Sequence, residues 1–178
     1  MTAPYYTLEL LQANNSVGYL VKRCGILMTQ IAEQRFQSQP ITFTQWVVLA
    51  QLSEHSSLTP TELSEQLGHD IGALTRIVDD LLKKKLVRRQ RSEQDRRAVQ
   101  ITVTAEGRRL AKATKAVVLE LANDVVEPYS RAETDLLISL LQRMLAHMEN
   151  VAEESKKHSS RMEHKAASSG ARRASRRK

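Results

Sequence analysis

Three helix-start motifs constrain this chain more than any other feature of its sequence. In a capping box, a Ser or Thr and a Glu or Gln three residues later satisfy each other's free backbone N–H groups. The pattern occurs at Thr42–Gln45, at Thr59–Glu62 with Pro60 in the first helical position, and at Ser130–Glu133. Each box precedes a segment with apolar residues at helical spacing. The sequence therefore predicts a mainly α-helical fold.

A long amphipathic helix is expected from about Leu8 to Arg35, where apolar residues recur at steps of three and four. These residues are Val17, Leu20, Val21, Cys24, Leu27, Met28 and Ile31. The helix should end before Pro40, because the residue that precedes proline is disfavoured in a helix. Helical spacing returns after Thr104 as far as Pro128, and again from Ser130 to Val151.

One segment has the period of a strand instead. From Ala98 to Thr104 apolar and polar residues alternate, as in a half-buried strand. Leu86–Arg89 can pair with it across the polar loop Gln90–Arg97. The sequence therefore predicts a two-stranded hairpin with a cationic tip.

Leu58–Leu86, which precedes this hairpin, has the pattern of a helix-turn-helix. A short helix (Thr59–Leu67) stops at Gly68, which tolerates the left-handed conformation of a helix end, and Asp70 opens the second helix. Together with the hairpin, the two helices predict a winged helix-turn-helix.

The second helix of such a motif enters the major groove of DNA, where arginine can bond guanine. We expect Thr75 and Arg76 to read bases, Gly72 and Ala73 to allow close backbone approach, and Lys83 to contact DNA from the same face. The alternative is the exposed face of an ordinary helical hairpin.

The hairpin tip supplies a second set of candidates, namely Arg91, Asp95, Arg96 and Arg97. An arginine at a wing tip can enter a narrow minor groove, where the potential is most negative. Asp95 would orient the Arg97 guanidinium. The alternative for any single arginine is a solvated surface charge.

Basic residues are concentrated in two parts of the chain, whose formal net charge is +7. Residues 76–115 contain 13 basic and five acidic side chains, and residues 155–178 contain nine basic and one acidic. A cationic stretch of this kind favours a polyanionic partner. We expect residues 155–178 to form a disordered basic tail, because they can bury almost nothing. A non-specific architectural DNA-binding protein that uses this tail remains an alternative.

Other classes of protein fit poorly. No apolar run exceeds five residues, so we expect no membrane association. The N-terminus lacks the order of a secretory signal, so we expect a cytoplasmic protein. A single cysteine and five histidines without metal-binding spacing predict no catalytic residues, no metal site and no cofactor.

The chain resembles the MarR family of winged-helix regulators over about residues 10–154. The similar segments are Leu63–Gly68, Leu74–Leu81, Leu86-Val87, Asp95–Ala98 and Val103–Gly107. The resemblance implies a homodimer on pseudo-palindromic double-stranded promoter DNA, usually a repressor released by a small phenolic or aromatic-acid effector. It places Thr75 and Arg76 in the recognition helix, and Asp95 and Arg97 in the wing. One departure is Lys85, where family members commonly have glycine; a positive φ there would be held at some cost.

On this interpretation residues 1–41 form an N-terminal dimerisation helix, 42–104 the DNA-binding region, and 105–154 C-terminal dimerisation helices. The apolar stripe of the final helix supports dimerisation, and an intramolecular helical subdomain is the alternative.

The resemblance also places an effector where the dimer helices meet the winged helix. Tyr19, Arg23 and Trp46 are candidate ligand-binding residues there, although Trp46 also fits a core and Arg23 a salt bridge. An oxidant-sensing repressor triggered by Cys24 is an alternative. We expect Cys24 to be an inert, buried thiol, because it lies on the apolar stripe of its helix.

Overall fold

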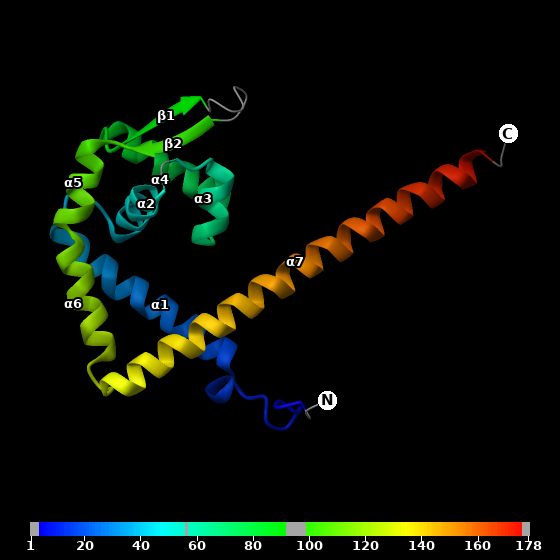
Figure 1. The fold of residues 1–178 in the computed structure, drawn as a ribbon, viewed down its shortest axis with the longest axis horizontal. Coiled ribbons are helices and arrows are strands. Elements are labelled where there is room, and N and C mark those ends of the chain that lie inside the picture. Colours follow the sequence, from blue (N-terminus) through cyan, green and yellow to red (C-terminus); the bar gives the residue numbers. More distant parts are fainter. Residues whose placement is uncertain (1–3, 56, 92–98, 176–178) are drawn as a thin grey trace. The chain divides into compact units, whose positions relative to one another are not determined.

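The computed structural model describes residues 4–55, 57–91 and 99–175, and the chain divides into two units, residues 1–124 and 125–178. The predicted wing-tip residues Asp95, Arg96 and Arg97 lie outside the described residues. The elements are η1 (Ala13–Asn15), α1 (Val17–Arg35), η2 (Phe36–Ser38), α2 (Phe43–Glu54), α3 (Pro60–Leu67), α4 (Ile71–Lys83), β1 (Val87–Arg91), β2 (Val99–Val103), α5 (Ala105–Ala113), α6 (Lys115–Val126) and α7 (Arg131–Ser175) (Figure 1). The mainly helical fold with a two-stranded wing is confirmed.

All three capping boxes form as predicted. The Thr42 hydroxyl accepts from the Gln45 backbone N–H, and Thr59 and Ser130 act in the same way on Glu62 and Glu133. In return, the Glu62 carboxylate accepts from the Thr59 backbone N–H at 2.7 Å, which lowers the pKa of this carboxyl. Each box closes the first turn of its helix.

The first long helix starts later than its periodicity predicted, at Val17 rather than about Leu8. Ser16 has an extended backbone, and its hydroxyl accepts from the Tyr19 backbone N–H. Tyr6 folds back so that its hydroxyl accepts from the Val17 N–H at 3.0 Å. A local cap and this long-range hydrogen bond therefore set the start of α1.

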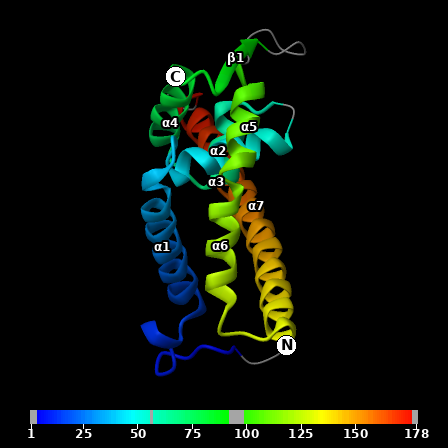
Figure 2. The same cartoon turned by 90° about the vertical axis from the view of Figure 1, so that its left-hand side faces the viewer.

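The core of the first unit lies where α2, α3 and α4 meet the hairpin (Figure 2). Leu49, Leu63, Leu74, Leu81 and Ile101 are fully buried there. Leu58, just before α3, exchanges two backbone hydrogen bonds with Ile101 of β2, at 3.1 and 2.7 Å. The hairpin is thus tied to the helix-turn-helix by main-chain bonds as well as by apolar packing.

The two strands are antiparallel, and the first strand is longer than the sequence predicted. Val87 pairs with Val103, and the ladder continues to Arg91, which pairs with Val99. Gln90 and Arg91 therefore lie in β1 and not in the loop, because Gln90 finds a cross-strand partner in Gln100.

The second unit contains one long helix, α7, which is longer than the sequence predicted. α7 does not stop near Val151 or Glu154 but continues to Ser175. Residues 155–175 contain no proline that would end the helix, and their four alanines and six lysines and arginines favour it, whereas their six serines and Gly170 do not. In the described part of the chain, no helix has the length and apolarity that crossing a bilayer requires.

Apolar stripes on α1 and on α7 are solvent-accessible in this single chain. On α1 they include Val17, Leu20 and Leu27, and on α7 Leu137, Leu141 and Val151. Cys24 is exposed as well, which contradicts the prediction of a buried thiol. The prediction failed because the face of α1 that carries Cys24 is not covered within one copy of the chain.

Candidate nucleic-acid interface

The second helix of the helix-turn-helix, α4, has one buried and one exposed face. Gly68 ends α3 with φ +62°, and Asp70 then opens α4. Leu74, Val78 and Leu81 are buried against the core. This packing leaves the N-terminal half of the opposite face free for a partner.

The structure places both predicted base readers on this exposed face. Thr75 and Arg76 are exposed, as the helical period predicted. The Thr75 hydroxyl donates to the Ile71 carbonyl at 2.7 Å, so it can only accept from a further partner. Among the described residues, Arg76 has no hydrogen-bond or ion-pair partner. Its guanidinium retains all of its donors for a ligand.

Gly72 and Ala73 lie in the first turn of α4, and their close approach to DNA stays a prediction. Their backbone N–H groups donate to the Asp70 carboxylate at 2.8 and 3.2 Å. A Cβ atom at Gly72 would lie 3.0 Å from the same carboxylate oxygen. These residues therefore shape the cap of α4, and their N–H groups are occupied while the cap is closed.

Lys83 lies at the far end of α4. Its ammonium group donates to Asp80 at 2.9 Å, which raises the Lys83 pKa. Both side chains are largely exposed, so the pair is weak. Lys83 can leave Asp80 for another anion at little cost.

The wing is fixed to α4 by a contact that sequence reasoning missed. Arg89 of β1 pairs with Asp79 of α4 at 2.8 Å, and Arg88 donates to the Thr102 hydroxyl at 3.0 Å. No local sequence signal identifies the ion pair, because it depends on how the hairpin crosses the helix. The predicted candidate Arg91 is exposed in β1.

The turn between α4 and β1 holds Lys85 with φ +59°. The Lys85 N–H donates to Leu82 O, the Leu86 N–H donates to Leu81 O, and the Thr104 hydroxyl donates to Lys85 O. These bonds impose the left-handed conformation that the resemblance had raised as a question for this position. A side chain there is strained relative to glycine.

The candidate effector residues do not meet in one cavity. Trp46 lines a cavity of about 480 Å³ between α2 and α5. Its indole N–H donates to Ala111 O at 3.0 Å and its ring stacks on Phe43, so it is also a packing residue. Tyr19 and Arg23 are exposed on α1 and line none of the three cavities found in the described residues.

The Trp46 cavity carries a cationic lining that sequence reasoning did not single out. Arg108, Lys112 and Lys115 surround it, with Glu54 as its acidic residue. These basic residues follow at steps of four and three along α5 and the start of α6, which places them on one side of the cavity. The helical spacing could have been read from the sequence.

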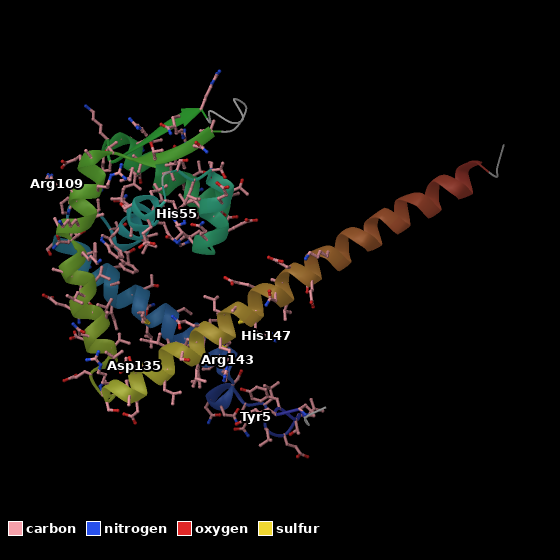
Figure 3. The ribbon with its side chains drawn as sticks, viewed as in Figure 1. Tyr5, His55, Arg109, Asp135, Arg143 and His147 are labelled. Carbon is pink, nitrogen blue, oxygen red and sulfur yellow. The ribbon has the colours of Figure 1, made fainter. Side chains whose placement is uncertain are left out.

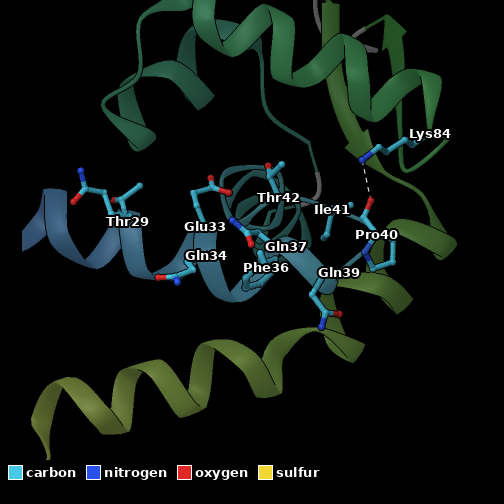
Figure 4. Close-up of a pocket in the computed structure, with 11 residues that line it drawn as sticks. Thr29, Glu33, Gln34, Phe36, Gln37, Gln39, Pro40, Ile41, Thr42 and Lys84 are labelled. Atoms are coloured by element: carbon cyan, nitrogen blue, oxygen red, sulfur yellow. Dashed lines mark hydrogen bonds between the residues drawn. The ribbon is translucent and has the colours of Figure 1, made fainter.

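A second cavity, of about 800 Å³, lies at the C-terminal end of α1 (Figure 4). Its polar groups are used by the fold. The Glu33 carboxylate accepts from the backbone N–H groups of Phe43 and Thr44 at the start of α2, at 3.0 and 2.9 Å. Lys84 donates to Pro40 O and to Gln45 at 2.9 Å each. Hydrogen bonds in this region therefore hold the ends of α1, α2 and α4 together.

Within the described ranges, no cluster of three or more His, Cys, Asp or Glu side chains could hold a metal ion. His55 and His147, both labelled in Figure 3, illustrate the dispersal, since one follows α2 and the other lies within α7.

Comparison with known proteins agrees with this geometry. A family model described as MarR family matches residues 41–99. The organic hydroperoxide resistance transcriptional regulator of Bacillus subtilis is 36% identical over 90 residues, which cover 47% of this chain and 61% of the relative. That alignment spans less than two thirds of the relative. Transcriptional repressor MprA of Escherichia coli is 25% identical over 140 residues, covering 76% of this chain and 80% of MprA.

A solved structure supplies the deciding agreement. Wild-type MarR of E. coli superimposes with a TM-score of 0.66 at 27% identity, covering 73% of this chain and 97% of that structure. Residues 41–99 match the MarR family, and the fold around them matches that of MarR. The relatives named above are a transcriptional regulator and a transcriptional repressor.

A second MarR-family structure, the S. aureus MepR–DNA complex, has a TM-score of 0.64 at 26% identity and covers 74% of this chain and 97% of its own. Both MarR-family structures are thus matched almost completely, while about a quarter of this chain has no counterpart in either.

Proposed function

We propose that the protein is a homodimeric repressor that binds pseudo-palindromic promoter DNA and is released by a small aromatic or phenolic carboxylate. The observation that carries the proposal is Arg76 on the exposed face of α4, which has no partner among the described residues, while the opposite face of α4 is buried in the core. A helix held in this way can offer a guanidinium to guanine in the major groove with little loss of order.

The comparisons support the DNA partner. The MepR structure is a complex with DNA, and a mutant of E. coli MarR was solved in complex with operator DNA. In both proteins the fold matched here is seen with DNA. For this chain, Arg76 and Thr75 supply base contacts, while Lys83 and Arg91 supply phosphate contacts at the two sides of α4.

The exposed apolar stripes support the homodimer. Leu20 and Leu27 on α1, and Leu141 and Val151 on α7, are each more than a third exposed in the single chain. Covering such stripes with a second copy removes apolar surface from water. A two-fold dimer would place two copies of α4 about 34 Å apart, which is one turn of duplex.

The cavity beside Trp46 supports an acidic aromatic effector. An indole and three basic side chains around about 480 Å³ suit a planar anion of modest size. BpsR of Bordetella bronchiseptica, which shares the fold at 22% identity, is described as regulated in DNA binding by 6-hydroxynicotinic acid. In this chain the effector would contact Trp46 and Arg108, and Tyr19 and Arg23 remain predicted contributors from α1.

Footprinting on the DNA upstream of the gene tests the proposal. We expect a short, two-fold symmetric footprint that a member of a panel of aromatic carboxylates abolishes. Arg108→Gln should raise the ligand concentration needed for release without changing the footprint. Protection without sequence preference would instead indicate an architectural DNA-binding protein.

Cys24, which is exposed in a single copy of the chain, is the residue for a second candidate function, oxidant sensing. A Cys24 thiolate would displace an alcohol from an organic hydroperoxide and become a sulfenic acid. The Bacillus subtilis relative is named for organic hydroperoxide resistance. Release of DNA by stoichiometric hydroperoxide in the wild type, but not in Cys24→Ser, would establish this function in place of the carboxylate effector.

A further inference from the structure

The C-terminal part of α7 carries charge without an apolar face. The helix continues to Ser175, and residues 155–178 contain nine basic side chains and one acidic. The MarR and MepR structures are matched over 97% of their length while about a quarter of this chain is left over.

The basic residues of this helix are not spread evenly around its axis. Lys157, Arg161, Lys165 and Arg172 follow at steps of four, four and seven, so they lie within about 100° of one another at 3.6 residues per turn. Lys156 and Arg173 lie off this stripe, and Glu163 lies on the other side. At 1.5 Å per residue the cationic stripe is about 22 Å long.

We propose that this cationic stripe is a second DNA-contacting surface, which binds the sugar–phosphate backbone without reading bases. The proposal rests on the proposed DNA-binding function and extends it beyond the winged helix. Duplex DNA carries one negative charge per about 1.7 Å of axis, so a straight row of cations of this length can neutralise several phosphates at once.

The composition of the remaining faces favours DNA over an anionic lipid surface. A helix that lies in a membrane interface needs large apolar residues opposite its basic face. Met162 is the only large apolar residue between 155 and 178, and all the others are alanine, serine, glycine, histidine or charged residues. Such a helix has cations that can bind phosphates, but almost no apolar side chain that could insert into a lipid layer.

Two pairs of substitutions with the same change in charge test the stripe in the full-length protein. Arg161→Gln/Lys165→Gln removes two cations from it, and Lys156→Gln/Arg173→Gln removes two that lie off it. Binding to a mixed-sequence duplex is measured by fluorescence anisotropy over a range of salt concentrations. Thermal melting and size-exclusion chromatography check that fold and oligomeric state are retained.

Each phosphate contact contributes about 0.9 to the slope of log affinity against log salt. Removing the two cations on the stripe should therefore reduce the slope by about 2 per chain. Removing the two cations off the stripe should reduce it by less than half as much. Deleting residues 155–178 should reduce it by about 4 per chain while a footprint on the upstream DNA persists. Equal effects of the two pairs, or an unchanged slope after deletion, would overturn the proposal.

The failures of the two proposals can be told apart. If the truncated protein keeps its footprint with an unchanged salt slope, the stripe proposal alone fails. If the full-length protein binds no duplex, the proposed function fails with it. If deletion abolishes binding to phosphatidylserine vesicles and leaves the DNA slope unchanged, an anionic lipid surface is the partner and the DNA assignment is wrong.

Discussion

At the scale of single residues, Gly107 shows how closely the winged helix is packed. It lies in the first turn of α5, where its N–H donates to the Thr104 hydroxyl at 3.1 Å. A Cβ atom here would lie 2.1 Å from the Leu86 carbonyl oxygen. That oxygen already accepts from the backbone N–H and the hydroxyl of Thr104, so the backbone cannot move aside without losing both bonds.

Gly107→Ala should therefore lower the free energy of unfolding by about 1–3 kcal/mol, as overpacking against fixed atoms does. Gly18→Ala is the matched control, since its Cβ would lie 4.0 Å from the Ser16 hydroxyl oxygen. The control should be neutral or stabilising by less than about 1 kcal/mol, because alanine favours a helix. The free energies of unfolding of both variants are measured by urea denaturation. Equal changes in the two variants would show that the contact at Gly107 can relax.

Lys85 is a residue whose strain can be relieved. Its φ of +59° costs a side chain about 1–2 kcal/mol, part of which glycine loses again through the greater entropy of its unfolded chain. We expect Lys85→Gly to stabilise the protein by about 0.5 kcal/mol.

The neighbouring Lys84, with φ −75° and hydrogen bonds to Pro40 and Gln45, is the control for this substitution. Lys84→Gly should destabilise by about 1 kcal/mol or more. Thermal melting distinguishes the two positions. A similar loss of stability in both variants would contradict the assignment of strain to Lys85.

At the scale of elements, the wing and α4 are coupled by the ion pair between Arg89 and Asp79. Both side chains are about half exposed, which limits the strength of the pair. A double-mutant cycle with Asp79→Ala and Arg89→Ala should give a coupling energy of about 0.2–1 kcal/mol that decreases with added salt. A coupling of zero at low salt would mean that the wing is held to α4 by packing alone.

The elements also show which parts of the fold a sequence can predict. Gly68, Asp70 and the capping boxes act through neighbours three residues away, so their helices could be located from local patterns. The start of α1 depends in part on Tyr6 reaching Val17 from 11 residues away, and the Arg89–Asp79 pair depends on the crossing of two elements. Such contacts require the tertiary fold.

Two further predictions failed for identifiable reasons. The last helix was expected to end near Val151, where its apolar periodicity ends, but α7 continues to Ser175. Cys24 was expected to be buried because it shares a stripe with Leu20 and Leu27, but those residues are exposed in one copy of the chain. Periodicity identifies an apolar face without stating whether the same chain covers it.

At the scale of the whole molecule, the two units divide the proposed functions between them. The first unit holds the recognition helix, the wing and the cavity beside Trp46, and the second holds a long helix with an apolar stripe followed by a cationic one. The excess of basic residues between Arg76 and Lys115 already indicated which part of the chain meets a polyanion. Arg108, Lys112 and Lys115 line the cavity beside Trp46, so these cations could bind an effector rather than DNA.

Sequence-specific binding through α4 is tested most directly by comparing Arg76→Ala with Arg109→Ala. Arg109 is an exposed arginine that projects from α5 and pairs with Glu106 (Figure 3). Affinity is measured on the footprinted operator and on a scrambled duplex of equal length. Arg76→Ala should lose about 1–3 kcal/mol on the operator and little on the scrambled duplex, while Arg109→Ala changes both slightly and equally. Equal losses on the two duplexes for Arg76→Ala would contradict base reading by α4.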